Sequence, residues 1–262
     1  FVHVIILFLA WGAPLSEAYL NFTSYSTPAI QPIKCTAMSR DGQVMVASSF
    51  GGVVYSINSG NTWQLSSNLP TGDFIYWWNY IVVNRDSGQY GVVYSFYGTL
   101  YYTNTYGASW AASNNICSGT PCGGRGLVMS ASGTYVIVGI YHLNNNVYTY
   151  NIFRSTNRGV SFTVGTLPSG TVLLGLIAMD STGQYAIACT DNSAPIYSSN
   201  YGASWTMSSS TVGTTRKVFM SADGSLSFSA SNSAGVVHTS TDKGVTWTVS
   251  TTIPGSDPDV TL

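Results

Sequence analysis

The sequence predicts an all-β fold, a β-propeller in which one small antiparallel sheet is repeated around a central channel. The first observation is an eight-residue motif that occurs five times and ends in an aromatic residue, at Trp63, Trp110, Phe162, Trp205 and Trp247. These positions lie 47, 52, 43 and 42 residues apart. The second observation is that the intervening runs are short, rich in Val, Ile, Tyr and Thr, and bounded by Gly and Asn, as strands between tight turns are. Such a sheet buries both faces only when neighbouring copies stack against it.

A second landmark precedes each motif. It is a short turn of polar residues that ends in glycine, at Gly42, Gly88, Gly133, Gly183 and Gly224. These glycines stand 21, 22, 29, 22 and 23 residues before the matching aromatic residue, which leaves room for four strands in each antiparallel blade. In the fourth unit we expect strands at residues 173–179, 185–190, 194–198 and 204–207. The longer third interval predicts a longer connection between the second and third strands, over residues 142–151.

The landmarks divide residues 34–262 into blades at about 34–66, 76–113, 124–165, 172–209 and 215–250. The stretch that begins at Thr252 resembles the one at Leu167, which introduces the fourth blade. A further blade is therefore expected to begin within residues 251–262. The five visible blades would then be part of a propeller of six or seven blades.

The N-terminal residues predict export. Residues 1–18 form an apolar run that ends in Ser16-Glu17-Ala18, which is typical of a secretory signal peptide; the alternative is a buried N-terminal strand. The run is too short to span a bilayer, so no stable membrane insertion is expected after cleavage. Residues 19–33 form a lead segment, and Asn21 begins an N-glycosylation sequon. The predicted location is secreted or on the cell surface.

Composition excludes one class of partner. The chain carries nine Lys and Arg against ten Asp and Glu, a net charge of −1, and only 7% of its residues are charged. No basic field is present to hold a phosphate backbone, so nucleic acid is not an expected partner. None of the His and Cys residues has the spacing of a metal site, and we predict neither a metal nor a cofactor. His238 stands where the other blades carry apolar or aromatic residues and is expected to be packed or half-exposed.

The four cysteines fall into two groups. Cys117 and Cys122 bracket a turn-forming Ser-Gly-Thr-Pro stretch, which predicts a loop-closing disulfide in an oxidising compartment; the alternative is two free thiols. Cys35 and Cys189 lie in apolar runs of different repeats. We interpret each of these two as a small core residue.

The eight-residue motif resembles the Asp-box, Ser-x-Asp-x-Gly-x-Thr-Trp, of the BNR or sialidase-type repeat family. The resemblance covers roughly residues 34–250 and rests on all five copies, although only Asp242 keeps the acid. The matching residues in the other copies are Asn58, Thr105, Asn157 and Asn200. Asn still accepts hydrogen bonds from turn amides, so the turn is expected to persist while any role of the charge is in doubt.

The motif is interpreted as a structural brace. Its glycines, Gly60, Gly107, Gly159, Gly202 and Gly244, meet the positive φ that a tight hairpin requires. The terminal aromatic ring is expected to begin the fourth strand and to fill the gap between adjacent blades. The family resemblance implies that these turns lie on the face opposite the ligand site. Charged residues in the turns, among them Arg158, Asp180 and Lys243, are then interpreted as solvated.

The opposite face carries the candidate binding residues. Aligning the first strands places Lys34, Asn79, Arg125, Gly175 and Arg216 at one equivalent position. Lys34, Arg125 and Arg216 would form a partial cationic ring at the channel mouth, suited to a carboxylate or sulfate. The alternative is that they reach solvent or pair with Asp73 and Asp191 on the same face.

Aromatic residues lead into the second blade. Tyr76 and Trp77 would offer rings on which the apolar face of a sugar stacks, and the alternative is that they pack in the core. The expected partners are therefore a glycan or an extracellular protein.

Catalysis is the less favoured function. Glycosidases need two carboxyl groups that flank the scissile bond, and the only glutamate, Glu17, lies in the predicted signal peptide. The predicted function is a non-catalytic binding module or an extracellular structural component, with no catalytic residue assigned. The alternative is a sialidase-like or other polysaccharide-cleaving enzyme whose catalytic residues lie partly outside this sequence.

Overall fold

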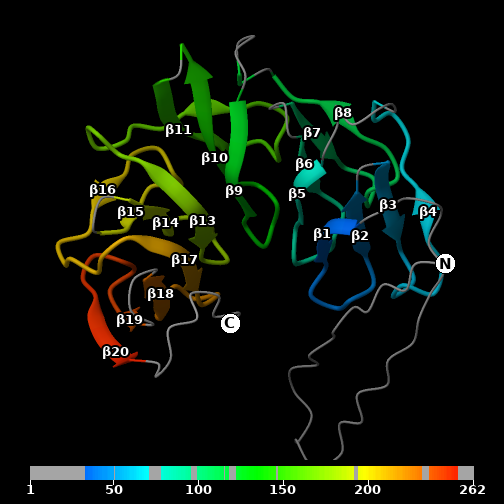
Figure 1. The fold of residues 1–262 in the computed structure, drawn as a ribbon. Coiled ribbons are helices and arrows are strands. Elements are labelled where there is room, and N and C mark those ends of the chain that lie inside the picture. The colour runs from blue at the N-terminus through cyan, green and yellow to red at the C-terminus, as the bar shows by residue number, and fades with distance from the viewer. Residues whose placement is uncertain are drawn as a thin grey trace, which may run out of the picture.

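The chain folds into five four-stranded antiparallel sheets, each made of strands that are consecutive in sequence (Figure 1). The computed structural model describes residues 33–49, 51–70, 78–95, 99–114, 116–117, 122–145, 147–191, 194–231 and 236–252. All regular elements in these ranges are strands. This arrangement confirms the predicted all-β architecture of repeated four-stranded antiparallel blades.

The strands of each sheet follow the two landmarks. The first blade contains β1 (Ile33–Met38), β2 (Met45–Ser49), β3 (Gly52–Ser56) and β4 (Gln64–Leu65). The second contains β5 (Trp78–Val83), β6 (Gly91–Ser95), β7 (Leu100–Thr103) and β8 (Ala111–Ala112). The third contains β9 (Cys122–Met129), β10 (Val136–Asn144), β11 (Val147–Ser155) and β12 (Thr163–Val164). The fourth contains β13 (Leu173–Met179), β14 (Ala186–Thr190), β15 (Ile196–Ser198) and β16 (Thr206–Met207). The fifth contains β17 (Thr215–Met220), β18 (Ser227–Ser231), β19 (Val236–Ser240) and β20 (Thr248–Thr252).

Two boundaries differ from expectation. β20 pairs with β19 as far as Thr252, so residues 251 and 252 complete the fifth blade and do not start another one. Each fourth strand begins one residue after the aromatic residue of the motif, and in the second to fifth blades that aromatic ring lies in the joint with the preceding blade. Residues 253–262 lie outside the described part of the chain.

The insertion in the third blade is a strand extension. The register of β10 with β11 continues without a shift from Val136↔Ser155 to Asn144↔Val147. Of residues 142–151, expected as a longer connection, residues 142–144 lengthen the second strand and residues 147–151 lengthen the third. Tyr, Thr and Val favour strands, which explains why this polar stretch remains extended.

The blades follow one another around an arc. The inner strands β1, β5, β9, β13 and β17 pack in chain order, and Figure 1 shows the arc open between the first and fifth blades. The core consists of apolar layers between consecutive blades. At four joints a β-branched residue of the second strand is fully buried: Val46, Val92, Ile137 and Ile187. Burying such side chains stabilises the fold by about 1.5–3 kcal/mol each.

The motif aromatics occupy these same joints. Trp110, Phe162, Trp205 and Trp247 are buried against the preceding blade. Trp63 is only half-buried and packs with Ile33, Ala47 and Val54 of its own blade. The described residues place no sheet before the first blade, which accounts for the difference.

Strand direction assigns the loops to two faces. The start of β1 lies beside the end of β2, at Ile33↔Ser49, whereas Met38 lies beside Met45 at the other end. The glycine turns and the eight-residue motifs therefore share one face, which we call the turn face. The opposite face carries the starts of the inner strands and the tip of the β10–β11 hairpin, and we call it the hairpin face.

Candidate functional site

The eight-residue motifs use their polar side chains internally. In the fourth blade Ser198 Oγ accepts a hydrogen bond from the Gly202 amide at 3.0 Å, and Asn200 Oδ1 accepts one from Ser204 at 3.0 Å. Asn58, Asn157 and Asp242 accept the equivalent bond at 2.9, 3.0 and 2.9 Å. Thr105 also keeps this acceptor, because its hydroxyl accepts from the Ser109 amide at 3.0 Å. The turn therefore requires an oxygen at this position and no charge.

The motif backbone is bound by the preceding blade. The Ser67 amide donates to the Ala108 carbonyl at 2.9 Å, and the Trp110 amide donates back to Ser67 at 3.3 Å. Thr166 forms the same pair of bonds with Ala203 and Trp205, both at 2.9 Å. These bonds brace consecutive blades against one another.

Three charged turn residues are not simply solvated. Asp180 is 3% exposed and accepts hydrogen bonds from the Tyr185 amide at 3.0 Å and the Thr182 hydroxyl at 2.6 Å. The expectation that Asp180 is solvated is therefore wrong, because the hydroxyl and amide donors of its own turn bind the carboxylate in place of water. Arg158 lies 4.1 Å above the ring of Tyr90, and Lys243 lies 3.6 Å above that of Tyr185. At the joint between the third and fourth blades the Tyr201 ring stacks on the Tyr135 ring, with centroids 4.1 Å apart.

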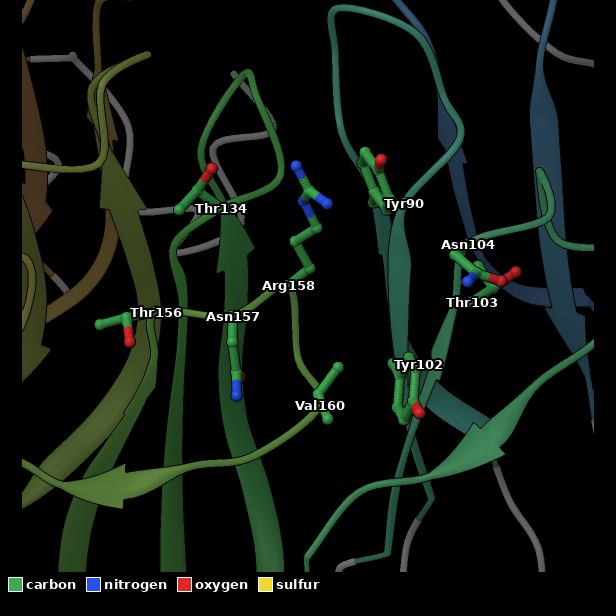
Figure 2. A pocket seen from close by; sticks show the side chains of 9 residues that line it. All are labelled: Tyr90, Tyr102, Thr103, Asn104, Thr134, Thr156, Asn157, Arg158 and Val160. Atoms are coloured by element: carbon green, nitrogen blue, oxygen red, sulfur yellow. The ribbon is translucent and has the colours of Figure 1, made fainter.

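A pocket of about 350 Å³ lies at the turn-face joint of the second and third blades. Figure 2 shows Arg158 and Val160 on one side and Tyr90 and Tyr102 on the other. Asn157, also in the lining, already bonds Ser161 through both its amide oxygen and its amide nitrogen. The pocket is therefore part of the seam between blades.

The hairpin face holds the residues predicted to be equivalent. The pairing of each inner strand with its neighbour is interrupted by a register shift. These shifts fall between Ile33 and Cys35, between Trp78 and Tyr80, at Arg125 in β9, between Leu173 and Ile177, and between Thr215 and Lys217. Lys34, Asn79, Arg125 and Arg216 are thus the extra residues of four matching β-bulges, and Gly175 lies within the fifth shift. A bulge redirects the side chain of its extra residue, so the alignment has a common backbone cause.

Arg125 has the best-defined surroundings of these residues. Its guanidinium lies 4.6 Å from the centroid of the Tyr141 ring. The Tyr148 ring meets Tyr141 edge to face, with centroids 5.6 Å apart and an angle of 64°. Tyr148 is 53% exposed, whereas Arg125 is half-buried and its Nε is buried without a hydrogen-bond partner. Arg125, Tyr141 and Tyr148 form a cation–aromatic wall, which we call the Arg–Tyr wall.

Glycine makes room for the wall. A Cβ built on Gly123 would lie 2.5 Å from the ring of Tyr141. Any side chain at this position would displace that ring, and with it the contact to Arg125. Neither Tyr141 nor Tyr148 was expected as a site residue, since Tyr148 falls in the stretch of residues 142–151 that predicts a connection and Tyr141 directly precedes it.

A disulfide lies at the base of the wall. Cys117 and Cys122 form a disulfide at the entry to β9, and the Tyr94 hydroxyl lies 3.5 Å from Cys122 Sγ. Burial raises the pKa of Tyr94 well above its ordinary value, so its hydroxyl stays neutral. Burial also raises the pKa of Tyr80, with Arg125 opposing the shift.

The other predicted site residues are dispersed. Lys34 and Arg216 are exposed on their bulges. Asp191 is exposed after β14 and accepts a hydrogen bond from Thr214 at 3.2 Å, next to the start of β17. Asp73, Tyr76, Trp77, Asn21 and the predicted signal peptide lie outside the described residues.

The remaining titratable groups offer no metal centre. In the described ranges no group of three or more His, Cys, Asp or Glu side chains could hold a metal ion. Cys189 is buried outside any disulfide, and burial raises its pKa to about 12. Cys35 is half-buried and is not part of a disulfide. His238 is buried, and burial lowers its pKa.

The described part of the chain contains no helix with the length and apolar character needed to cross a membrane.

Comparison with known proteins identifies the fold. No protein-family model matches the chain, and no curated protein is similar to it in sequence. It is similar in structure to an ancestral GH74 enzyme, with a TM-score of 0.62 and 15% identity over 83% of this chain and 31% of that one. It is also similar to YCF48 bound to a D1 peptide, with a TM-score of 0.56 and 15% identity over 86% and 68%. A nidogen/laminin complex gives a TM-score of 0.57 and 10% identity over 84% and 79%.

These similarities and the five repeated sheets define a β-propeller protein. The chain spans less than a third of the GH74 enzyme and about two thirds of YCF48. At these identities the similarity concerns the fold alone.

Proposed function

We propose that this chain is a non-catalytic binding module, an Asp-box propeller of the BNR type, whose hairpin face recognises an acidic glycan. The observation that carries the proposal is the Arg–Tyr wall. A guanidinium held over one ring beside a second, exposed ring can pair with a carboxylate while the ring packs on the apolar face of a sugar. Lys34 and Arg216, on matching bulges, extend the positive character of this face.

Binding assays with matched sugars test the proposal. Uronic-acid and sialic-acid oligosaccharides would be titrated against neutral analogues of the same length. Arg125→Ala is expected to weaken acidic-glycan binding at least about tenfold, because a charge-assisted hydrogen bond contributes about 1.5–3 kcal/mol. Tyr148→Ala should weaken both series, and Arg158→Ala, on the turn face, should change neither. The role of Arg125 is refuted if Arg125→Ala binds the acidic and the neutral sugars with the same affinities as the parent protein.

The positions of the acids support binding over hydrolysis. Among the described residues Asp41, Asp86, Asp180, Asp223 and Asp242 belong to turns of the turn face, and Asp191 is on the hairpin face. A glycosidase needs two carboxyl groups around one bond. We expect no turnover of sialosides or uronic-acid polymers. Cleavage of either substrate that is lost on replacing Asp191 would instead establish an enzyme.

A structural component of an extracellular assembly is the second candidate. It is favoured by the repeated hydrogen bonds between blades and by the scarcity of charge. YCF48 with a D1 peptide and nidogen with laminin are propeller relatives in complexes with protein partners, which supports a protein ligand for this chain as well.

We also propose that the module acts outside the cell. The support is the signal-like sequence of residues 1–18 and the disulfide between Cys117 and Cys122, since disulfides persist in oxidising compartments. Expression in a secreting eukaryotic host should give a protein that starts at Tyr19 and loses mass on deglycosylation unless Asn21 is replaced by Gln. Retention inside the cell with an intact N-terminus would contradict the location.

A further inference from the structure

The outer edge of β11 is only partly covered. β12 pairs with β11 at Phe153 and Arg154, and the Gly165 amide donates to the Ile152 carbonyl at 2.8 Å. Among the residues that the structure describes, no strand pairs with this edge over residues 147–151. Figure 1 shows the β10–β11 hairpin extending away from the shorter strands around it. An open strand edge thus projects from the hairpin face.

The backbone groups at this edge can be assigned. Successive residues of a strand direct their N–H and C=O groups to opposite sides. The Ile152 carbonyl faces β12, so the matching groups of Tyr150 and Tyr148 face the open side. Those of Thr149 face β10, with which Thr149 is in register at His142. Two donors and two acceptors, from Tyr148 and Tyr150, therefore point outward.

The edge lacks the usual protection. Natural proteins guard exposed edges with Lys, Pro, bulges or covering segments. No Lys, Arg, Asp, Glu or Pro occurs from Gly126 to Phe153, and the β10–β11 register has no bulge. Val147 and Tyr148 are 60% and 53% exposed, and both residue types favour strands. The ligand that satisfies such an edge is another uncharged β-strand.

We propose that β11 pairs antiparallel with β11 of a second copy of this chain, around a twofold axis at Thr149. Tyr148 would then lie opposite Tyr150 of the second copy, and Tyr150 opposite its Tyr148. Each pair exchanges two backbone hydrogen bonds, so all four outward groups of one chain are used. Because both edges are uncharged, no like charges meet across the axis. The third blades of the two copies would then form one continuous sheet. The proposal does not rest on glycan binding.

Cross-linking tests this register. In the proposed dimer the two Thr149 residues face each other as a non-hydrogen-bonded pair, with Cα atoms about 4.5 Å apart. This separation is within reach of a disulfide. With Cys35 replaced by Ser, Thr149→Cys should form a covalent dimer under mild oxidation, and Val147→Cys, which would face Asn151, should not. Equal cross-linking at both positions, or at neither, would overturn the register.

Light scattering over a concentration series tests the association itself. The parent chain should show a dimer that Tyr150→Pro abolishes, because proline removes one outward N–H group. Tyr150→Phe keeps the backbone and should remain dimeric, and near-ultraviolet circular dichroism would verify that both variants are folded. A parent chain that stays monomeric up to millimolar concentration refutes the proposal. Dimerisation of folded Tyr150→Pro would also refute the proposal.

Discussion

Gly88 lies directly against Val44 of the preceding blade, so that a Cβ built on the glycine would be 2.4 Å from Val44 Cβ. The contact joins the glycine turn of one blade to the second residue after the same turn in the preceding blade. Similar close approaches bring Gly133 to Tyr90 and Gly183 to Tyr135. At these three joints the backbone of a glycine turn therefore lies directly against Cβ atoms of the preceding blade.

Gly88 and Gly42 form a matched pair for measuring this contact. Both have positive φ, 70° and 69°, but a Cβ on Gly42 would meet no atom within 4 Å. Gly42→Ala should therefore cost only backbone strain of about 1 kcal/mol. Gly88→Ala adds overpacking and should cost about 2–4 kcal/mol in the free energy of unfolding, measured by urea titration. Equal losses in the free energy of unfolding for the two variants would show that Val44 moves aside at no cost in stability.

The motif aromatics should differ in their contribution to stability. Trp205 is 5% exposed and packs in the joint with Ile137 and Ile152, whereas Trp63 is half-buried. Trp205→Ala is expected to lower the free energy of unfolding by about 3–5 kcal/mol, and Trp63→Ala by less. Chemical denaturation followed by circular dichroism would measure both. A larger effect at Trp63 would contradict the assignment of the joints.

Acid should destabilise the joint between the fourth and fifth blades. His238 and Ser229 form a cross-strand pair where the other blades carry Val93 with Tyr101 or Ala188 with Ile196. His238 Nδ1 and Ser229 Oγ are buried without a hydrogen-bond partner. Burial lowers the pKa of His238 below 6.5, so the unfolded chain binds the proton more readily and stability falls as the pH drops below that value.

His238→Phe provides the measurement. Removing an unpaired buried polar group should raise the free energy of unfolding by about 1 kcal/mol at pH 7. The loss of stability between pH 7 and pH 5 should be smaller than in the parent, with His142, whose pKa burial also lowers, present in both proteins. An unchanged pH profile would exclude His238 as its source.

The disulfide closes a short loop below the Arg–Tyr wall. Cys117 and Cys122 are five residues apart, so removing the bond with a Cys117→Ser/Cys122→Ser pair should cost about 2 kcal/mol by loop-closure entropy. Thiol titration of the denatured protein should detect two reactive thiols before reduction, those of Cys35 and Cys189, and four afterwards. Four reactive thiols without reductant would rule out the bond.

The repeat was predictable because its signals are local. A glycine turn and an aromatic residue at constant spacing define a blade without knowledge of its neighbours, and the β13 bounds of Leu173–Met179 coincide with the expected range. The positions of Lys34, Arg125 and Arg216 were also accessible, since a constant register requires each bulge at the same distance from the turn.

The Arg–Tyr wall was not predictable for a physical reason. Tyr141 and Tyr148 meet because two strands extend past the end of the blade and because Gly123 leaves space for a ring. Neither condition has a sequence signal of its own, since a polar stretch with three consecutive asparagines is typical of a loop. Asp180 was misassigned for a similar reason: an acid in a turn is usually solvated, and only the fold shows its burial.

The bonds from Ser67 and Thr166 to the following motif give the chain a direction of assembly. The first, third and fourth blades each end in a two-residue fourth strand, and the chain that leaves it is held by backbone about forty positions later. On the ribosome a blade would therefore stay unfinished until its successor had emerged from the exit tunnel. Synthesis would close the joints one at a time from the N-terminus, so a pause in translation would leave only the newest blade incomplete.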